Sequence, residues 1–300
     1  MFYRRKIILA LLQLFDGQLD KIRLQKLLFL FSTKQAGMRK GGKVEYEFIP
    51  YKFGCYSYSA NADLTTMVKK GFLTEDEKFF AKKDPKDYLK QLKVEDLTLL
   101  QEVKTNYGGM SPTALMKHTY INFPFYAIKS EVAENILTKA ELEKVTEAKP
   151  INTKTILYTI GYEGISLEEY LVRLVKNDVK VLVDVRNNPV SMKYGFSKSQ
   201  LERYCASLDI AYVHIPEVGI QGDQRQELNT QGDYDQLFDV YRKKNLPNTT
   251  IEQQQIFSLL KQHKRIALTC FEANICQCHR KPLAESIGGL PGFTFEIRHI

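Results

Sequence analysis

The stretch "VKVLVDVR" at residues 179–186 decides the fold of the second half of the chain. It is a nearly continuous run of apolar, mostly β-branched residues, which predicts a strand that is buried on both faces of its sheet. Strands of this kind occur in parallel sheets that carry helices on both sides. An amphipathic pattern precedes the strand at 166–178, where Ser166 stands at the N-cap position and acids fill the first turn.

The same alternation of strand and helix patterns continues on both sides of this unit. Strand patterns occupy residues 153–161, 179–186, 210–216, 264–270 and 293–300. Helix patterns occupy residues 166–178, 197–209, 234–246, 251–263 and 280–289. Repeated βα units predict a Rossmann-like α/β domain with a mostly parallel, doubly wound sheet. We place this domain at 154–300, after the polar, proline-containing segment "KPINTK" at 149–154.

Residues 1–148 have a different pattern, which is mainly helical. Apolar spacing predicts helices at 4–15, 21–35, 58–73, 95–107, 111–120 and 131–148. Asp20 is placed to cap the second helix. The same helix contributes apolar residues that we expect to be buried in the core of this half: Leu27, Leu28, Leu30 and Phe31. The alternating aromatic stretch at 43–54 predicts a strand-like wing. Together these elements predict a winged-helix-like domain.

Charge and cysteine content limit the classes of protein that the chain can represent. Residues 1–150 hold 25 Lys and Arg against 18 Asp and Glu, whereas residues 151–300 hold 18 against 17. The basic excess is therefore N-terminal and suggests a nucleic-acid or other anionic partner, although a solubilising surface explains it as well. No apolar run is long enough to predict a membrane partner. An odd count of five cysteines predicts reduced thiols in a cytoplasmic protein.

The unusual polar residues of the second half follow the predicted strands, at the edge where parallel sheets bind ligands. At these strand ends, we expect Tyr162, Glu163, Asp184, Arg186, Lys193, Tyr212, Glu217 and Arg280 to bind a ligand. The candidate catalytic residues are Cys278, His279, Glu272, Cys270 and His214. Tyrosines can stack on a base, and glutamates can carry protons or bind ribose hydroxyls, but core packing and loop capping are alternatives for both.

The segment "CFEANICQCHR" at 270–280 allows three kinds of site. An anion could bind at the start of the helix at 280–289, gripped by Arg280 and Arg186, although a structural pairing of Asp184 and Arg186 is equally compatible. Cys278 or Cys270 could act as a nucleophile, with His214 or His279 as its base. The spacing Cys270-x5-Cys276-x-Cys278-His279 is poor for zinc, so we predict no cofactor, with zinc as the alternative. Buried, unreactive thiols remain the alternative to all three.

Both halves of the chain resemble known families. The motifs "TIGYEG" (159–164), "VLVDVRNNP" (181–189), "YVHIPEVG" (212–219) and "LTCFE…CHRKPLAE" (268–285) resemble the prokaryotic family of domains of unknown function called DUF488. This resemblance implies a small Rossmann-like domain and no assigned reaction. Where the family often has an arginine, this chain has Met192 followed by Lys193. In the first half, "RLQKLLFLF" and "YKFG" resemble Panacea and related antitoxin-type domains of bacterial toxin–antitoxin and defence loci.

These observations predict a prokaryotic enzyme that acts on a nucleotide or a nucleic-acid end, as a hydrolase or in group transfer. The N-terminal domain would recognise nucleic acid or a partner protein, which is what the second resemblance implies. The alternative is a non-catalytic nucleotide sensor, or an antitoxin-like regulator that binds DNA or protein. Neither a GxGxxG fingerprint nor a Walker motif is present in the sequence, so ordinary dinucleotide-binding and NTPase functions lack support.

Overall fold

The structure is a computed structural model that describes residues 1–40, 42–222 and 228–300. It divides into two compact units, Met1–Lys149 and Pro150–Ile300, and each is described by itself. Within the described ranges, no helix combines the length and the apolar character needed to cross a membrane.

The second unit contains one five-stranded sheet, and its strands run parallel. The strands lie in the order β10-β6-β9-β7-β8. Their bounds are β6 Ile156–Gly161, β7 Val181–Asp184, β8 Ala211–His214, β9 Arg265–Cys270 and β10 Glu296–His299. Every residue of β7 and β9 is buried, as expected for central strands that are covered on both faces. The prediction of an α/β domain with a parallel sheet is confirmed.

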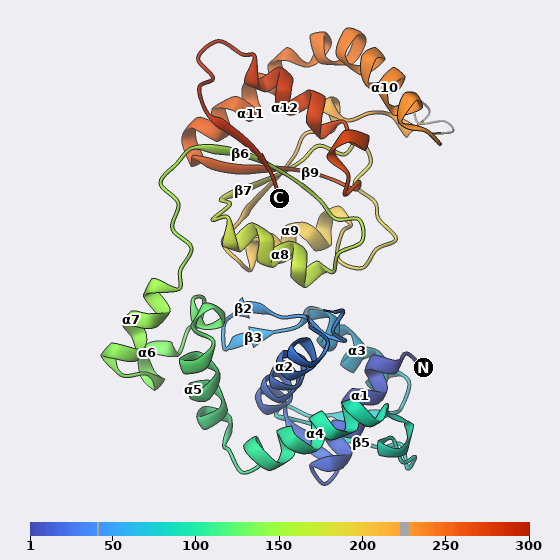
Figure 1. Ribbon diagram of the computed structural model, residues 1–300, viewed down its shortest axis with the longest axis vertical. Helices are drawn as coiled ribbons and strands as arrows, with labels where there is room; N and C mark the ends of the chain where they lie inside the picture. Colours follow the sequence, from blue (N-terminus) through green and yellow to red (C-terminus); the bar gives the residue numbers. More distant parts are fainter. Residues whose placement is uncertain (41, 223–227) are drawn as a thin grey trace. The chain divides into compact units, whose positions relative to one another are not determined.

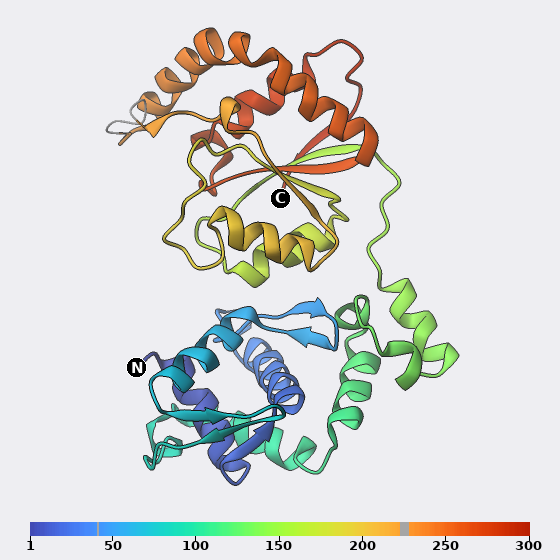
Figure 2. The same cartoon turned by 180° about the vertical axis from the view of Figure 1, so that it is seen from behind.

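Helices cover both faces of this sheet (Figures 1 and 2). The helices are α8 Leu167–Lys176, α9 Lys198–Ala206, α10 Gln231–Val240, α11 Thr250–His263 and α12 Arg280–Gly288. Figure 1 shows α8 and α9 on one face and α11 and α12 on the other. The hydroxyl of Ser166 accepts a hydrogen bond from the backbone N–H of Glu169, so the predicted N-cap of α8 is confirmed.

The order of the strands creates a crevice at the carboxyl end of β9. The chain leaves β6 and β7 toward α8 and α9, whereas it leaves the intervening strand β9 toward α12 on the opposite face. Loops that diverge in this way leave space between them, and open α/β sheets bind ligands at such points. The segment between β9 and α12 is short and contains a single 3₁₀ turn, Ile275–Gln277.

The first unit is mainly helical, with two small antiparallel sheets. Its first helices are α1 Tyr3–Leu14, α2 Lys21–Met38 and α3 Tyr58–Lys69, followed by α4 Val94–Tyr107, α5 Pro112–Asn122, α6 Ala133–Ile136 and α7 Lys139–Glu147. One sheet has the order β1-β5-β4, and its strands are β1 Gln18–Asp20, β4 Leu73–Glu75 and β5 Phe79–Lys82. The other is a hairpin of β2 Ile49–Tyr51 and β3 Gly54–Tyr56.

Two details of the first unit differ from the sequence-based expectation. The stretch at 43–54 contributes only to the hairpin β2–β3, while β4 and β5, which the sequence patterns do not predict, pair with β1. The single helix expected at 131–148 is divided into α6 and α7. Thr138 causes this division, because its side chain and that of Glu141 form a capping box that starts a new helix.

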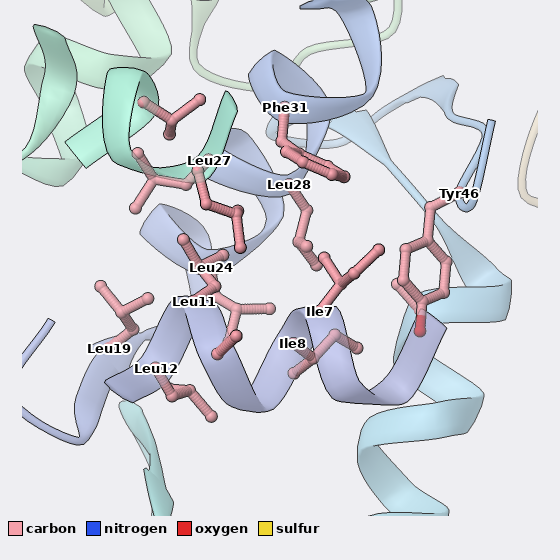
Figure 3. Close-up of a cluster of buried hydrophobic side chains, with 14 of the residues drawn as sticks. Ile7, Ile8, Leu11, Leu12, Leu19, Leu24, Leu27, Leu28, Phe31 and Tyr46 are labelled. Atoms are coloured by element: carbon pink, nitrogen blue, oxygen red, sulfur yellow. The ribbon is translucent and has the colours of Figure 1, made fainter. Parts of the chain in front are cut away.

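An apolar core built around α1 and α2 holds the first unit together (Figure 3). Six consecutive residues of α1, from Ile7 to Leu12, are fully buried. Leu27, Leu28, Leu30 and Phe31 of α2 are also buried, as predicted. Asp20 caps α2 by accepting hydrogen bonds from the N–H groups of Ile22 and Arg23, which confirms the predicted start of this helix.

Candidate functional site

A cavity of about 390 Å³ opens at the carboxyl edge of the parallel sheet. Its walls come from the ends of three neighbouring strands: Tyr162 after β6, Arg186 to Asn188 after β7, and Cys270 with Phe271 at the end of β9. The remaining lining residues are Val190, Ser191, Met192, Ile220 and Gly222. The volume falls within the usual range for small-molecule sites, and its position is the crevice where α/β sheets bind ligands.

Four metal-ligating or reactive side chains gather beside this cavity and form what we call the thiol cluster: Cys270, Glu272, Cys278 and His279. One donor atom from each lies within 4.8 Å of the donor atoms of the others. Cys270, Cys278 and His279 are buried, and Glu272 is partly exposed. Cys270 also lines the cavity, so it connects the thiol cluster to any ligand bound there.

The imidazole of His279 is held between two groups. Its Nε2 lies 3.1 Å from the carbonyl oxygen of Val185, and its Nδ1 lies 3.8 Å from Sγ of Cys270. Because a carbonyl oxygen can only accept, Nε2 carries a proton, and in the tautomer with a single proton on Nε2, Nδ1 presents its lone pair to the thiol. This arrangement has the order of a thiol, a base and a group that orients the base.

The second thiol has a different environment. Sγ of Cys278 lies 3.1 Å from a carboxylate oxygen of Glu272 and accepts a hydrogen bond from Nε of Arg280, also at 3.1 Å. Burial raises the pKa of Cys278 well above its usual value, and the nearby Cys270 adds to this effect, while the charge of Arg280 opposes it. When nothing is bound at the cluster, the thiol of Cys278 is therefore protonated at neutral pH.

Arg280 is only 1% exposed and does not form an open anion grip. Besides its bond to Cys278, its Nη2 donates to the backbone carbonyl of Glu272. The first turn of α12 is closed in the same way, because Cys278 and His279 at its start are buried. The structure therefore does not place Arg280 in the open position that the predicted phosphate grip at this helix start requires. Its guanidinium is used inside the protein to hold the loop that carries the thiol cluster.

Arg186 also has internal partners that occupy most of its donors. It binds both carboxylate oxygens of the fully buried Asp184, and its Nη1 donates to the hydroxyl of Tyr162 and to the carbonyl of Phe196, each at 2.8 Å. Burial alone would lower the pKa of Arg186, but the hydrogen bonds and the charge of Asp184 raise it. Of the two alternatives for these residues, the structural pairing is the one present, although Arg186 does line the cavity.

Tyr162 and Tyr212 both contact this ion pair through their hydroxyl groups. The ring of Tyr162 is stacked on that of Phe196 at 4.2 Å and is only 2% exposed. The hydroxyl of Tyr212 donates to Asp184 at 2.6 Å, and burial followed by this carboxylate raises its pKa. Tyr162 therefore packs internally, whereas Tyr212 is half-buried.

The other predicted site residues lie outside the thiol cluster. His214 donates through Nε2 to the carbonyl of Arg186 at 2.9 Å, and its Nδ1 lies 3.4 Å from the ammonium nitrogen of Lys198. The ammonium group of Lys193 donates to the carbonyl of Tyr162. Glu163 accepts the N–H of Ala273 at 3.0 Å and thereby holds the loop, and Glu217 is exposed in a 3₁₀ turn away from the cavity wall.

Sequence reasoning missed several residues that line the cavity. Asn187 and Asn188 follow β7 directly, so the rule that points to strand ends could have identified them. Phe271 is 43% exposed and Met192 is fully exposed, and both contribute apolar surface at the rim. No sequence signal distinguishes these two residues from ordinary loop positions.

Gly161 explains how the loop after β9 can approach β6 so closely. A Cβ atom at this position would lie 1.9 Å from the carbonyl oxygen of Glu272 and 2.8 Å from Nη2 of Arg280. No side chain fits there without displacing the backbone of Glu272. The glycine at the end of β6 therefore determines where the thiol cluster lies.

Comparison with known families agrees with the second unit as described. Residues 166–287 match the family described as "Domain of unknown function DUF488", which confirms the resemblance in this half of the chain. The match contains the thiol cluster and most of the cavity wall. No curated protein matches the chain.

Proposed function

We propose that the C-terminal domain is a hydrolase or group-transfer enzyme that acts on a nucleotide or a nucleic-acid end bound in the cavity. The observation that carries this proposal is the position of Cys270, which belongs both to the cavity wall and to the thiol cluster. A ligand in the cavity would touch Cys270, with His279 directly behind it. Perturbed, buried reactive groups next to a cavity are the usual features of an active site.

The lining of the cavity supports recognition of the base and sugar more than of phosphate. Asn187 and Asn188 are exposed amides that can both donate and accept hydrogen bonds. The partly exposed ring of Phe271 offers a stacking surface for a base. In contrast, the charge of Arg186 is balanced by Asp184 within the protein. A nucleoside moiety in the cavity, with its phosphates directed toward solvent, accounts for these features.

A pair of cysteine variants tests this proposal. Cys270→Ser removes the thiol of the cluster residue that also lines the cavity, and Cys276→Ser is the matched control, because Cys276 is exposed and outside the cluster. We expect a screen of nucleotides and short oligonucleotides to find a substrate that the wild type and Cys276→Ser convert at similar rates. Cys270→Ser should bind the same ligand with little change in affinity but lose turnover. Binding without turnover in all three proteins would instead show a sensor.

We also propose that the N-terminal domain is a winged-helix-like module that contacts nucleic acid through α3. Without the hairpin β2–β3, its elements follow the order helix, strand, helix, helix, strand, strand, and the first strand pairs with the last in the sheet β1-β5-β4. On α3 and just beyond it, Asn61, Thr65, Lys69 and Lys70 are exposed. The β4–β5 turn carries Asp76 and Glu77 and would repel phosphates, so α3 is the better contact surface.

Salt dependence of binding by the full-length chain tests this second proposal. We expect binding to short DNA or RNA duplexes that weakens steeply with salt, because phosphate contacts release counterions. Lys69→Gln combined with Lys70→Gln should reduce both the affinity and the salt slope. Lys34→Gln is the control, because Lys34 is paired with Glu102 at 2.8 Å elsewhere on the unit. Absence of binding at low salt would favour a protein partner, as the antitoxin-type resemblance implies.

A further inference from the structure

The thiol cluster combines donor types that soft transition metals prefer. It contains two thiols, an imidazole nitrogen and a carboxylate, all within 4.8 Å of one another. Structural zinc sites bind four such ligands in a tetrahedron, with metal–ligand distances of about 2.0–2.3 Å. Donor atoms at the corners of such a tetrahedron lie about 3.3–3.8 Å apart, so the widest pair in the cluster would close by about 1–1.5 Å on metal binding. Thiolate and imidazole ligands favour zinc over magnesium, calcium or manganese.

The groups around the cluster are arranged as they are around bound metals. Ligating histidines usually donate their second ring N–H to a carboxylate or a backbone carbonyl, which directs the other nitrogen at the metal. His279 does this with the carbonyl of Val185, and its Nδ1 faces Cys270. Sγ of Cys278 accepts a hydrogen bond from Nε of Arg280, which would stabilise a thiolate ligand. These partners position the donors before any metal arrives.

Charge balance also fits a divalent cation. The positive charge of Arg280, which donates to Sγ of Cys278, equals in size the negative charge of Glu272, whose carboxylate also contacts Cys278. If Cys270 and Cys278 bind as thiolates, their two negative charges balance the two positive charges of the ion, and the buried site stays neutral. Buried charges that are not balanced in this way cost several kcal/mol each. An alkali cation or an anion would leave the site charged.

We propose that Cys270, Cys278, His279 and Glu272 bind one zinc ion at the floor of the cavity. On binding, each thiol would release its proton to solvent. Glu272 is the partly exposed ligand, so it is the one that a water molecule or a substrate group can replace. Three remaining ligands and an exchangeable fourth position are the arrangement of catalytic zinc sites. The metal site thus deepens the proposed function. The catalytic role of the zinc ion rests on that proposed function, whereas zinc binding itself does not.

The adjacent sequence positions of Cys278 and His279 argue against such a site when the sequence is taken alone. The structure removes this objection, because Cys278 stands before α12 and His279 is its N-cap residue, and both side chains reach the cluster. The structure also replaces one of the four ligands that the sequence spacing offers. Cys276 is exposed and outside the cluster, while Glu272 occupies the fourth position. Zinc enzymes that deaminate nucleobases use one histidine and two cysteines as ligands, but their glutamate transfers protons and is not a ligand.

Cobalt titration of the full-length, metal-free protein tests the site without any substrate. Cobalt(II) should produce thiolate-to-metal charge-transfer absorption that saturates at one ion per chain, and zinc should displace it. Cys276→Ser should behave like the wild type. Cys278→Ser removes a ligand of the metal. Its affinity for cobalt should therefore fall by at least roughly 10–100-fold, the loss that removal of an outer-shell partner alone causes. No such absorption in the wild type, or equal absorption in Cys278→Ser, would overturn the proposal.

A second measurement uses the wild type alone and so does not depend on whether a variant folds. Native mass spectrometry of the zinc-loaded wild type should show one bound ion per chain. This readout is preferred to alkylation, because Cys270 and Cys278 are buried even without metal. A chain that retains no ion would contradict zinc binding. Both measurements are separate from the nucleotide screen. Zinc binding without any nucleotide substrate would therefore reject the proposed function alone, and turnover by a protein that binds no zinc would reject the metal site alone.

Discussion

Nε2 of His279 donates a hydrogen bond to the carbonyl oxygen of Val185 at 3.1 Å, and this contact determines which ring nitrogen faces the thiols. Val185 follows β7 directly, whereas His279 caps α12 after β9. The neighbouring strand therefore orients the side chain that stands next to Cys270. The orientation of the His279 ring is thus a property of the sheet edge as a whole.

Replacement of His279 by Gln separates orientation from chemistry. A glutamine amide can still donate to Val185 but presents no basic nitrogen to Cys270. We expect the unfolding free energy to stay within about 1.5 kcal/mol of the wild type, the scale of one hydrogen bond. Cobalt affinity and turnover should both fall strongly. Equal cobalt affinity in His279→Gln, measured by titration, would show that the imidazole is not a ligand.

Gly161→Ala should displace the loop that carries the thiol cluster. The new methyl group would lie 1.9 Å from the carbonyl oxygen of Glu272, a contact that only movement of the backbone can relieve. We expect a loss of stability of about 1–3 kcal/mol, as for overpacking, together with weaker metal binding. Gly232→Ala in α10 is the control, because its methyl group would meet only Thr230, at 3.6 Å. Urea unfolding of both variants provides the comparison, and equal midpoints would contradict this steric explanation.

Asp184→Asn should be among the most destabilising single changes at the sheet edge. It leaves the charge of Arg186 buried without its partner, which typically costs about 3–5 kcal/mol. The double variant Asp184→Leu with Arg186→Met should recover much of this loss, because it removes both charges. Glu285→Gln, at an exposed pair with Arg242, should change stability by about 1 kcal/mol or less. A double variant no more stable than Asp184→Asn would contradict the electrostatic explanation.

Alkaline pH should destabilise the N-terminal unit through its buried tyrosines. Burial is the main cause that raises the pKa of Tyr3, Tyr88, Tyr120 and Tyr126 from 10.0 to about 12. In the unfolded chain these groups lose their protons near pH 10, so their stabilising contribution is complete below about pH 10 and is lost as pH rises toward 12. Urea midpoints at about pH 9 and about pH 11.5 should show this loss.

Tyr120→Phe provides the matched control for this pH effect. It removes one of the titrating groups and its hydrogen bond with Ser130, and the loss of that bond acts at both pH values. The difference between the midpoints at the two pH values should therefore be smaller in Tyr120→Phe than in the wild type. An unchanged difference would show that Tyr120 does not contribute to the alkaline loss of stability.

Local sequence patterns were sufficient to predict most elements of the second unit. The apolar run at 179–186 could be stable only as a covered central strand, and it forms β7. Ser166 and Asp20 mark helix starts because a capping side chain acts within three residues of itself. The small sheet of β1, β4 and β5 escaped prediction, since three-residue strands have too little periodicity to be recognised.

The sequence by itself determined that the residues of the site meet at one edge, because parallel strands place all their carboxyl ends on the same side. Only the tertiary structure decided what each residue does there. Arg186 and Arg280 bind internal partners since their long side chains are buried, and burial requires that a charge be balanced. Likewise, Glu272 and not Cys276 joins Cys270, Cys278 and His279, because the loop packs against Gly161. Such distances between loops depend on packing across strands, which sequence spacing does not encode.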